Sequence, residues 1–239
     1  MDIKIYILSG IIGLIAAFLS GTTAVGGAAL MTAILTLLIG GEFAVPALTI
    51  VMLIANLTRA ISGYKEIDWK SVGLFLITSL PLSLLGALGF TLLPKNLVNK
   101  VLGVAVIIFV ILKYVKFNNS KAGKKTILSV GIVSGFLSGF VGSSGPISAA
   151  LFFSLGLSPV GYVASEAAAV SVLHVAKILV YRSLMDIQHE IWIFSVIIGC
   201  VMIVGTILAN RFVGKIKPEP FQKYVSFVMI LMGLYMLLG

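Results

Sequence analysis

Long stretches of this 239-residue chain carry no charged residue. The four longest cover residues 5–41, 71–94, 126–165 and 191–210. About 20 apolar residues let a helix cross the hydrocarbon core of a bilayer, so each stretch predicts membrane-spanning helix. The first and third stretches are long enough for two helical elements with a break between them.

The apolar segments fall into two sets of five. The first set covers about residues 3–20, 26–39, 44–62, 71–92 and 97–115. The second covers about residues 127–139, 146–157, 159–181, 191–211 and 221–238. The second segment of each set is short for a full crossing, which predicts half-helices or the arms of re-entrant hairpins. The first segment is expected to be a retained helix rather than a signal peptide.

An internal repeat relates the two sets. Phe18-Leu19-Ser20-Gly21 recurs as Phe136-Leu137-Ser138-Gly139, and a break rich in glycine and small polar residues follows each copy. The same offset aligns Asn56 with His174, Arg59 with Lys177, and Asp68 with Asp186. Such a repeat defines the architecture before any single residue is interpreted.

The repeat predicts the organisation of the chain. We expect an N-terminal membrane repeat (1–116), a polar cytoplasmic linker (117–125) and a C-terminal membrane repeat (126–239). Each half crosses the membrane five times if the short segments cross, and three times if they form hairpins. Both numbers are odd, so the halves have opposite orientations, as in many secondary transporters. The predicted fold is therefore an all-α integral membrane protein of two inverted-topology repeats with broken or re-entrant helices near the midplane.

Basic residues favour one orientation in the cell membrane. Lysines cluster between residues 113 and 125, and short loops rich in Lys and Arg are typical of the cytoplasmic side. With that loop inside, both termini are expected outside. Lys95 and Lys100 then lie on the outer side, against the usual bias.

Composition excludes the soluble classes. The chain is 59% apolar and 10% charged, whereas a soluble domain is typically about 45–50% apolar and about 25% charged. Its net charge of +9 does not indicate a nucleic-acid partner, because the basic residues lie in short loops between apolar segments. The single cysteine, Cys200, cannot form an internal disulfide.

The two repeated breaks are the first candidate for chemistry. Pro146 suits the first turn of a helix, so a helix is expected to begin near Ser144 or Gly145 with free N–H groups and a positive dipole end. Such a helix end attracts anions. Irregular backbone at membrane depth is tolerated where protein or a water-filled cavity surrounds it. The alternative is that the small residues only allow close helix packing.

Polar residues inside two apolar segments are the second candidate. Asn56 and Arg59 lie one helical turn apart, and Glu166, His174 and Lys177 form one polar face of a long helix. Charged groups at membrane depth are costly and normally mark a transport pathway. Three alternatives stay open: the cations reach the membrane interface, His174 is structural, or Glu166 is the counter-ion of Lys177.

The expected substrate-binding residues combine these two features. They are Thr22, Thr23, Gly26, Gly27, Asn56, Arg59, Ser143, Ser144, Gly145, His174 and Lys177. Glu166 and His174 are the candidates for coupling transport to protons. The sequence contains no motif of a hydrolase, nucleotide-binding loop or metal site, so neither an enzyme, a metal nor a cofactor is expected.

The paired G-x-x-x-x-F-L-S-G stretches resemble the sulfite exporter TauE/SafE family of membrane permeases over essentially the whole chain. The resemblance implies transport of small, often sulfur-containing anions such as sulfite, thiosulfate or sulfoacetate. The expected function is a secondary transporter, acting as an exporter by alternating access in the lipid bilayer. An anion channel and a non-transporting membrane scaffold or assembly factor are the alternatives, and homodimer formation is left open.

Overall fold

The computed structural model describes residues 2–23, 27–114, 123–211 and 219–238. Over these residues the chain is helical and contains no strand. The helices of the first half are α1 (Ile3–Thr23), α2 (Gly27–Ile39), α3 (Gly41–Ser62), the short 3-10 helix η1 (Tyr64–Glu66), α4 (Trp69–Thr91) and α5 (Lys95–Tyr114). Those of the second half are α6 (Lys124–Val141), α7 (Gly145–Ser154), α8 (Pro159–Leu184), α9 (His189–Asn210) and α10 (Glu219–Leu238).

Six of the described helices are long and apolar enough to cross a membrane. They are α1, α3, α4, α6, α8 and α9. This confirms the expected class of all-helical membrane protein. The short helices α2 and α7 have 13 and 10 residues, so they measure about 20 Å and 15 Å, well below the roughly 30 Å of a bilayer core.

The break between α6 and α7 follows from its residues. Gly142 ends α6 in the left-handed conformation (φ 82°), which a residue with a Cβ rarely adopts. Ser144 is the N-cap of α7, and Pro146 follows in its first turn, where a missing N–H is tolerated. The break and the helix start therefore lie where the sequence predicts them.

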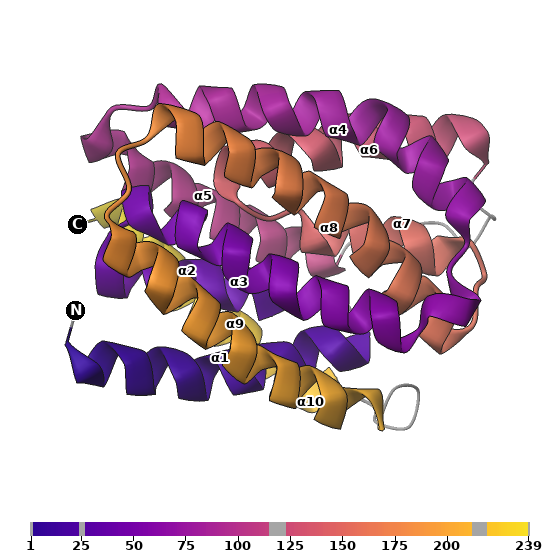
Figure 1. Cartoon of the computed structure of the whole chain (residues 1–239), viewed down its shortest axis with the longest axis horizontal. Coiled ribbons are helices and arrows are strands. Elements are labelled where there is room, and N and C mark those ends of the chain that lie inside the picture. The colour runs from indigo at the N-terminus through magenta and orange to yellow at the C-terminus, as the bar shows by residue number, and fades with distance from the viewer. Residues whose placement is uncertain (1, 24–26, 115–122, 212–218, 239) are drawn as a thin grey trace.

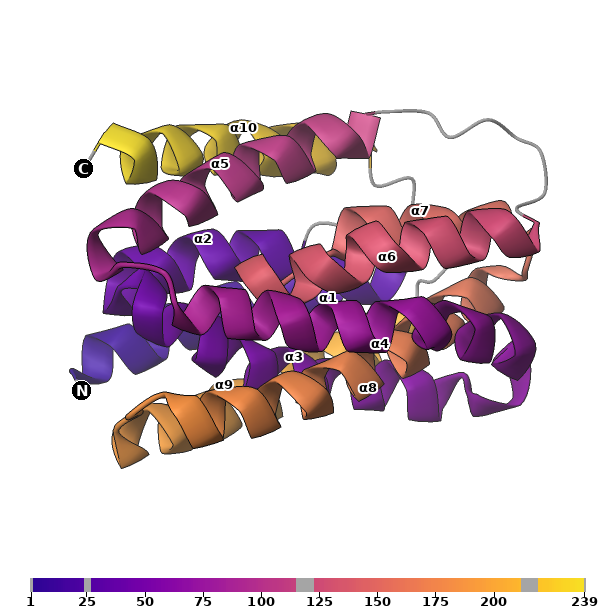
Figure 2. The same cartoon turned by 90° about the horizontal axis from the view of Figure 1, so that it is seen from above.

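The long helices run nearly along one direction, and α3 and α8, which the internal repeat aligns, run opposite ways. In Figure 1, α3 runs from the end that holds the N-terminus to the far end, and α8 runs back. The N- and C-termini lie at the same end of the molecule in Figures 1 and 2. The α3–α4 connection lies at the opposite end from the termini, whereas the α8–α9 connection lies beside them (Figure 1).

The two halves are interlocked rather than side by side. α1 packs against α9 of the other half, and α6 packs against α4, while α3 lies against both α8 and α9. α5 and α10 pack together along one flank (Figure 2). Residues 117–122 of the predicted linker lie outside the described residues. Helix α6 begins at Lys124, near the C-terminal end of that linker. The contact between α3 and α8 brings the two predicted polar faces together.

Candidate functional site

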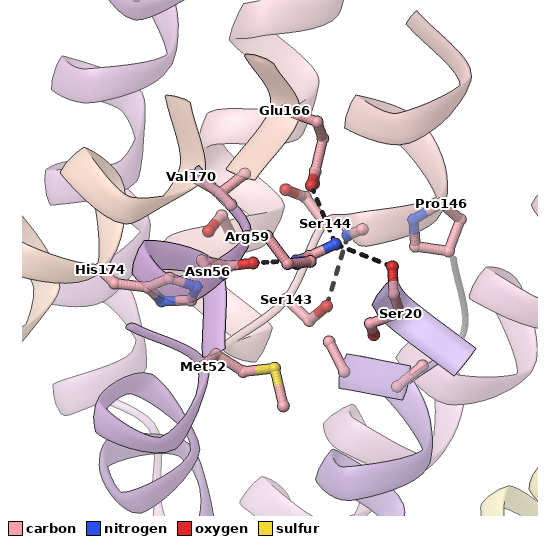
Figure 3. A pocket seen from close by; sticks show the side chains of 14 residues that line it. Ser20, Met52, Asn56, Arg59, Ser143, Ser144, Pro146, Glu166, Val170 and His174 are labelled. Carbon is pink, nitrogen blue, oxygen red and sulfur yellow. Dashed lines mark hydrogen bonds and ion pairs between the residues drawn. The ribbon is translucent and has the colours of Figure 1, made fainter. Parts of the chain in front are cut away.

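A small buried cavity lies where α3 and α8 meet the end of α1, the start of α2 and the α6–α7 break (Figure 3). Its volume is about 30 Å³. It is lined by Ser20, Ala28, Ala29, Met52, Asn56, Arg59, Ser138, Ser143, Ser144, Gly145, Pro146, Glu166, Val170 and His174. The charged and polar side chains in this lining are at most 5% exposed, so these groups are shielded from solvent in this conformation.

The cavity lies on the internal repeat. Eight of its lining residues form four pairs separated by the offset that aligns the two halves, so both halves contribute equivalent positions. The pairs are Ser20 with Ser138, Ala28 with Pro146, Met52 with Val170, and Asn56 with His174. Glu166 has no acidic equivalent, because Leu48 occupies the matching position of the first half.

Arg59 crosses the cavity from α3. Its Nη1 donates a hydrogen bond to the backbone oxygen of Ser20 (3.0 Å), and its Nη2 donates to Oδ1 of Asn56. Nη1 also lies 3.7 Å from Oε2 of Glu166, which forms a buried ion pair between the two halves. Figure 3 shows the guanidinium between these three partners.

Glu166 is held from a second side by α7. Its Oε1 accepts a hydrogen bond from the hydroxyl of Ser148 (2.9 Å). The alternative that Glu166 is the counter-ion of Lys177 is therefore wrong, since Glu166 pairs with Arg59. Eleven residues of helix separate Glu166 from Lys177 by about 16 Å along α8, too far for an ion pair.

Lys177 lies behind the cavity and caps the end of α6. Its Nζ donates to the backbone oxygens of Ser138 (3.0 Å) and Gly142 (3.1 Å) and contacts the Ser138 hydroxyl at 3.1 Å. The side chain is completely buried, so the alternative in which it reaches the membrane interface is wrong. A cation at a helix C-terminus compensates the negative end of the helix dipole.

Arg59 makes the equivalent contact in the first half. Its bond to Ser20 and the bond of Lys177 to Ser138 each span 39 residues and end on the serine of the repeated motif. Each half thus uses its matched cation to bind backbone oxygens at the last turns of its first helix. Arg59, at 5% exposure, does not reach the membrane interface either.

Several polar atoms of the cavity have no hydrogen-bond partner in the described part of the chain. They are Nε of Arg59, the Ser144 hydroxyl, Nδ1 of His174 and Oε2 of Glu166. A buried polar group without a partner costs about 1–3 kcal/mol. The Nε–H of Arg59 and the Ser144 hydroxyl are unused donors, so they suit a small anion with several acceptor oxygens.

The N-terminus of α7 differs in part from the expectation. It faces the cavity through Ser144, Gly145 and Pro146, but its N–H groups are mostly occupied. The Gly145 N–H donates weakly to the Ser143 hydroxyl (3.4 Å), and the Ile147 N–H donates to the backbone oxygen of Ser144. The prediction of free N–H groups at this helix start is therefore wrong. The helix dipole and the Ser144 hydroxyl remain as the features of α7 that favour an anion.

The structure brings most of the predicted site residues together. Asn56, Arg59, Ser143, Ser144, Gly145, Glu166 and His174 all line the cavity. Lys177 and Gly27 do not; Gly27 packs so tightly on α1 that a Cβ would lie 2.1 Å from the backbone oxygen of Ala16. Gly26 lies outside the described residues, as do the side chains of Thr22 and Thr23.

Sequence reasoning missed two lining serines. Ser20 and Ser138 belong to the repeated motif, so the repeat itself marked them, although we had not assigned them to the site. Among the described residues, no group of three or more His, Cys, Asp and Glu lies close enough to hold a metal ion.

A comparison with protein families identifies one match. The model of the family described as "Sulfite exporter TauE/SafE" matches residues 9–236, nearly the whole chain. Neither the curated proteins nor the solved structures compared with the chain include a match.

Proposed function

Because the chain belongs to the sulfite exporter TauE/SafE family, we propose that it is a secondary transporter that exports a small sulfur-containing anion through the cell membrane. Membership of this family indicates a membrane transporter of sulfur-related anions. Sulfite, thiosulfate and sulfonates such as sulfoacetate are the substrates we propose for this chain. In the proposed orientation the linker is cytoplasmic and both termini are outside.

The observation that carries the proposal is the buried Arg59 in a cavity shared by both halves. An arginine held at membrane depth costs free energy unless it has a function or complete pairing. Here its pairing is incomplete, because Nε has no partner within the described residues and the carboxylate lies 3.7 Å away. A bound oxyanion would supply the missing acceptors.

The burial of the cavity supports alternating access. Its charged and polar lining side chains are at most 5% exposed, so the lining must separate before a substrate reaches them. Helices α3 and α8 run in opposite directions and carry equivalent lining residues (Figure 1). We propose that the two halves move against each other around the cavity, which opens it to one side at a time.

Binding of small anions to the detergent-purified protein tests this function. The panel is sulfite, thiosulfate, sulfate, sulfoacetate, acetate and chloride, and the readout is thermal unfolding. A ligand specific for the native state stabilises it by about 2.7 kcal/mol at a hundredfold excess over Kd. We expect at least one sulfur anion to raise the unfolding temperature of the wild type and of Lys95→Gln, but not of Arg59→Gln. Lys95 is the control because it is 83% exposed and pairs with Glu42, outside the cavity lining.

Two outcomes would contradict the proposed function and favour another one. If no anion of the panel shifts unfolding, the chain has no ligand of this class, and a membrane scaffold becomes the better account. If anions pass through reconstituted protein without saturation, or as single-channel currents, the chain is an anion channel.

A further inference from the structure

The cavity already contains an anion, the carboxylate of Glu166. Glu166 is the acidic residue among the lining residues, and it is 2% exposed. Its carboxylate lies beside the same guanidinium that we propose for substrate binding. A transported anion and Glu166 therefore compete for Arg59.

The surroundings of Glu166 provide one cation within ion-pair distance. Arg59 approaches from α3, and the neutral hydroxyl of Ser148 donates from α7, a helix that contains no ionisable residue. On α8 itself, Tyr162 lies one turn before Glu166, His174 lies two turns after it, and Lys177 is fully engaged with α6. Among the lining residues from α1, α2 and α6, none is ionisable, and Lys70, the ionisable residue of α4, is exposed.

An anion next to an ionised Glu166 would place two negative charges in one buried cavity. Like charges a few ångströms apart repel strongly where water is excluded. A buried carboxylate that loses its cationic partner is also strongly destabilising. Binding one proton to Glu166 removes both costs. For a monoanion, the formal charge of the cavity is then the same when it is empty as when it is loaded.

We propose that Glu166 is a proton-binding site of the transporter: its carboxylate occupies Arg59 in the empty state and takes up one proton when the anion replaces it, so that anion and proton cross together. This inference rests on the proposed function. The proton comes from the side on which the anion enters and leaves on the side on which the anion is released. The Ser148 hydroxyl donates a hydrogen bond to the ionised carboxylate. It becomes a hydrogen-bond partner of the carboxylic acid once Glu166 is protonated.

Proton movement in liposomes tests the inference. The purified protein is reconstituted with a pH-sensitive dye inside, the membrane potential is clamped with valinomycin and potassium, and an inward thiosulfate gradient is applied. Thiosulfate is a dianion near neutral pH, so it carries no proton itself, and its uptake with one proton still moves one net negative charge, which the clamped potential compensates. We expect the wild-type lumen to acidify in step with uptake of [³⁵S]thiosulfate, with about one proton per anion.

Glu166→Gln separates the proton from the anion. This side chain mimics the neutral state, so we expect any thiosulfate that the variant exchanges across the membrane to move without acidification and without the pH dependence of the wild type. Glu42→Gln is the matched control, since it also removes an ion-paired glutamate but outside the cavity lining, and it should move both thiosulfate and protons. His174→Gln retains Glu166, so any thiosulfate that this variant transports should still be accompanied by protons.

The outcomes distinguish the two proposals. If the wild type moves no thiosulfate, the proposed function fails. If it moves thiosulfate without a change of lumenal pH, or with proton movement in the opposite direction, the function stands and the role of Glu166 is overturned. Persistent proton movement in Glu166→Gln overturns it as well. Should that variant not fold, the wild-type measurement still decides.

Discussion

Arg59 holds three parts of the molecule together at the scale of a single residue. It joins α3 to the last turns of α1 through Ser20 and to α8 through Glu166. Both members of the ion pair are buried, so each depends on the other for compensation of its charge. The same guanidinium therefore contributes to stability and to the proposed site.

A double-mutant cycle tests this dependence. Removing one partner of a buried ion pair costs about 3–5 kcal/mol, because the remaining charge stays buried without compensation. We expect Arg59→Gln to lower the free energy of unfolding by about this amount, and Arg59→Gln combined with Glu166→Gln to be less destabilised than the sum of the single variants. Unfolding of the purified proteins measures the cycle. Simple additivity would show that the pair contributes nothing.

Lys177 is expected to act on stability more than on binding. Replacing it with Met removes the hydrogen bonds from Nζ to the backbone oxygens of Ser138 and Gly142, and a buried acceptor left without a partner costs about 1–3 kcal/mol. We expect Lys177→Met to unfold at a lower temperature while its anion affinity changes less than that of Arg59→Gln. Lys70→Met, an exposed lysine on α4, serves as the control and should behave like the wild type. Loss of affinity equal to that of Arg59→Gln would place Lys177 in the binding site after all.

The spacing of polar residues predicted much of the site at this scale. Asn56, Arg59 and His174 were found because their positions match in the two halves and interrupt apolar helices. The pairing of Arg59 with Glu166 could not be predicted, because it depends on how α3 and α8 approach each other. The capping role of Lys177 depends in the same way on where α6 ends relative to α8.

At the scale of elements, close helix contacts determine how the two halves fit together. α6 approaches α4 so closely that a Cβ on Gly139 would lie 2.1 Å from the backbone oxygen of Ser83. A Cβ on Gly135 would likewise lie 2.3 Å from the backbone oxygen of Ser79. The sequence places glycines at four-residue intervals along α6, but it does not show which helix they face. The contact with α4 is therefore a finding of the structure.

Glycine-to-alanine variants test this contact. Gly139→Ala forces backbone against backbone and should lower stability by about 1–3 kcal/mol or more. Gly73→Ala, on the exposed side of α4 with nothing within 4 Å, should instead stabilise the helix by about 0.5–1 kcal/mol. Thermal unfolding of both variants provides the comparison. Equal effects would mean that the two helices are farther apart than the structure shows.

At the scale of the whole molecule, both halves are needed to build the cavity. Helices of one half pack mainly on helices of the other, and the lining comes from both. The repeat predicted the equivalence of the halves and the shared site. It did not predict the exchange of packing partners, because the aligned positions show which residues correspond but not which helices touch.

Cysteine labelling in intact membranes tests the arrangement of the termini. With Cys200→Ser as background, Lys4→Cys reports on the start of α1, Arg182→Cys on the end of α8, and Lys65→Cys on the α3–α4 connection. The start of α1 and the end of α8 lie at one end of the molecule, and the α3–α4 connection lies at the other (Figure 1). We expect an impermeant reagent to label the first two from outside and Lys65→Cys only after permeabilisation. Labelling of all three from one side would contradict the proposed topology.

Saturable uptake of [³⁵S]thiosulfate into liposomes is the most direct test of the central claim, that Arg59 in a buried cavity between the halves binds the transported anion. The account predicts saturable uptake by the wild type. It also predicts a loss of at least about tenfold, equivalent to about 1.4 kcal/mol, in the charge-balanced variant Arg59→Gln with Glu166→Gln. Because that variant leaves no buried charge unpaired, the loss would report the missing guanidinium rather than misfolding. Uptake that does not saturate, or that is unchanged in the double variant, would contradict the account.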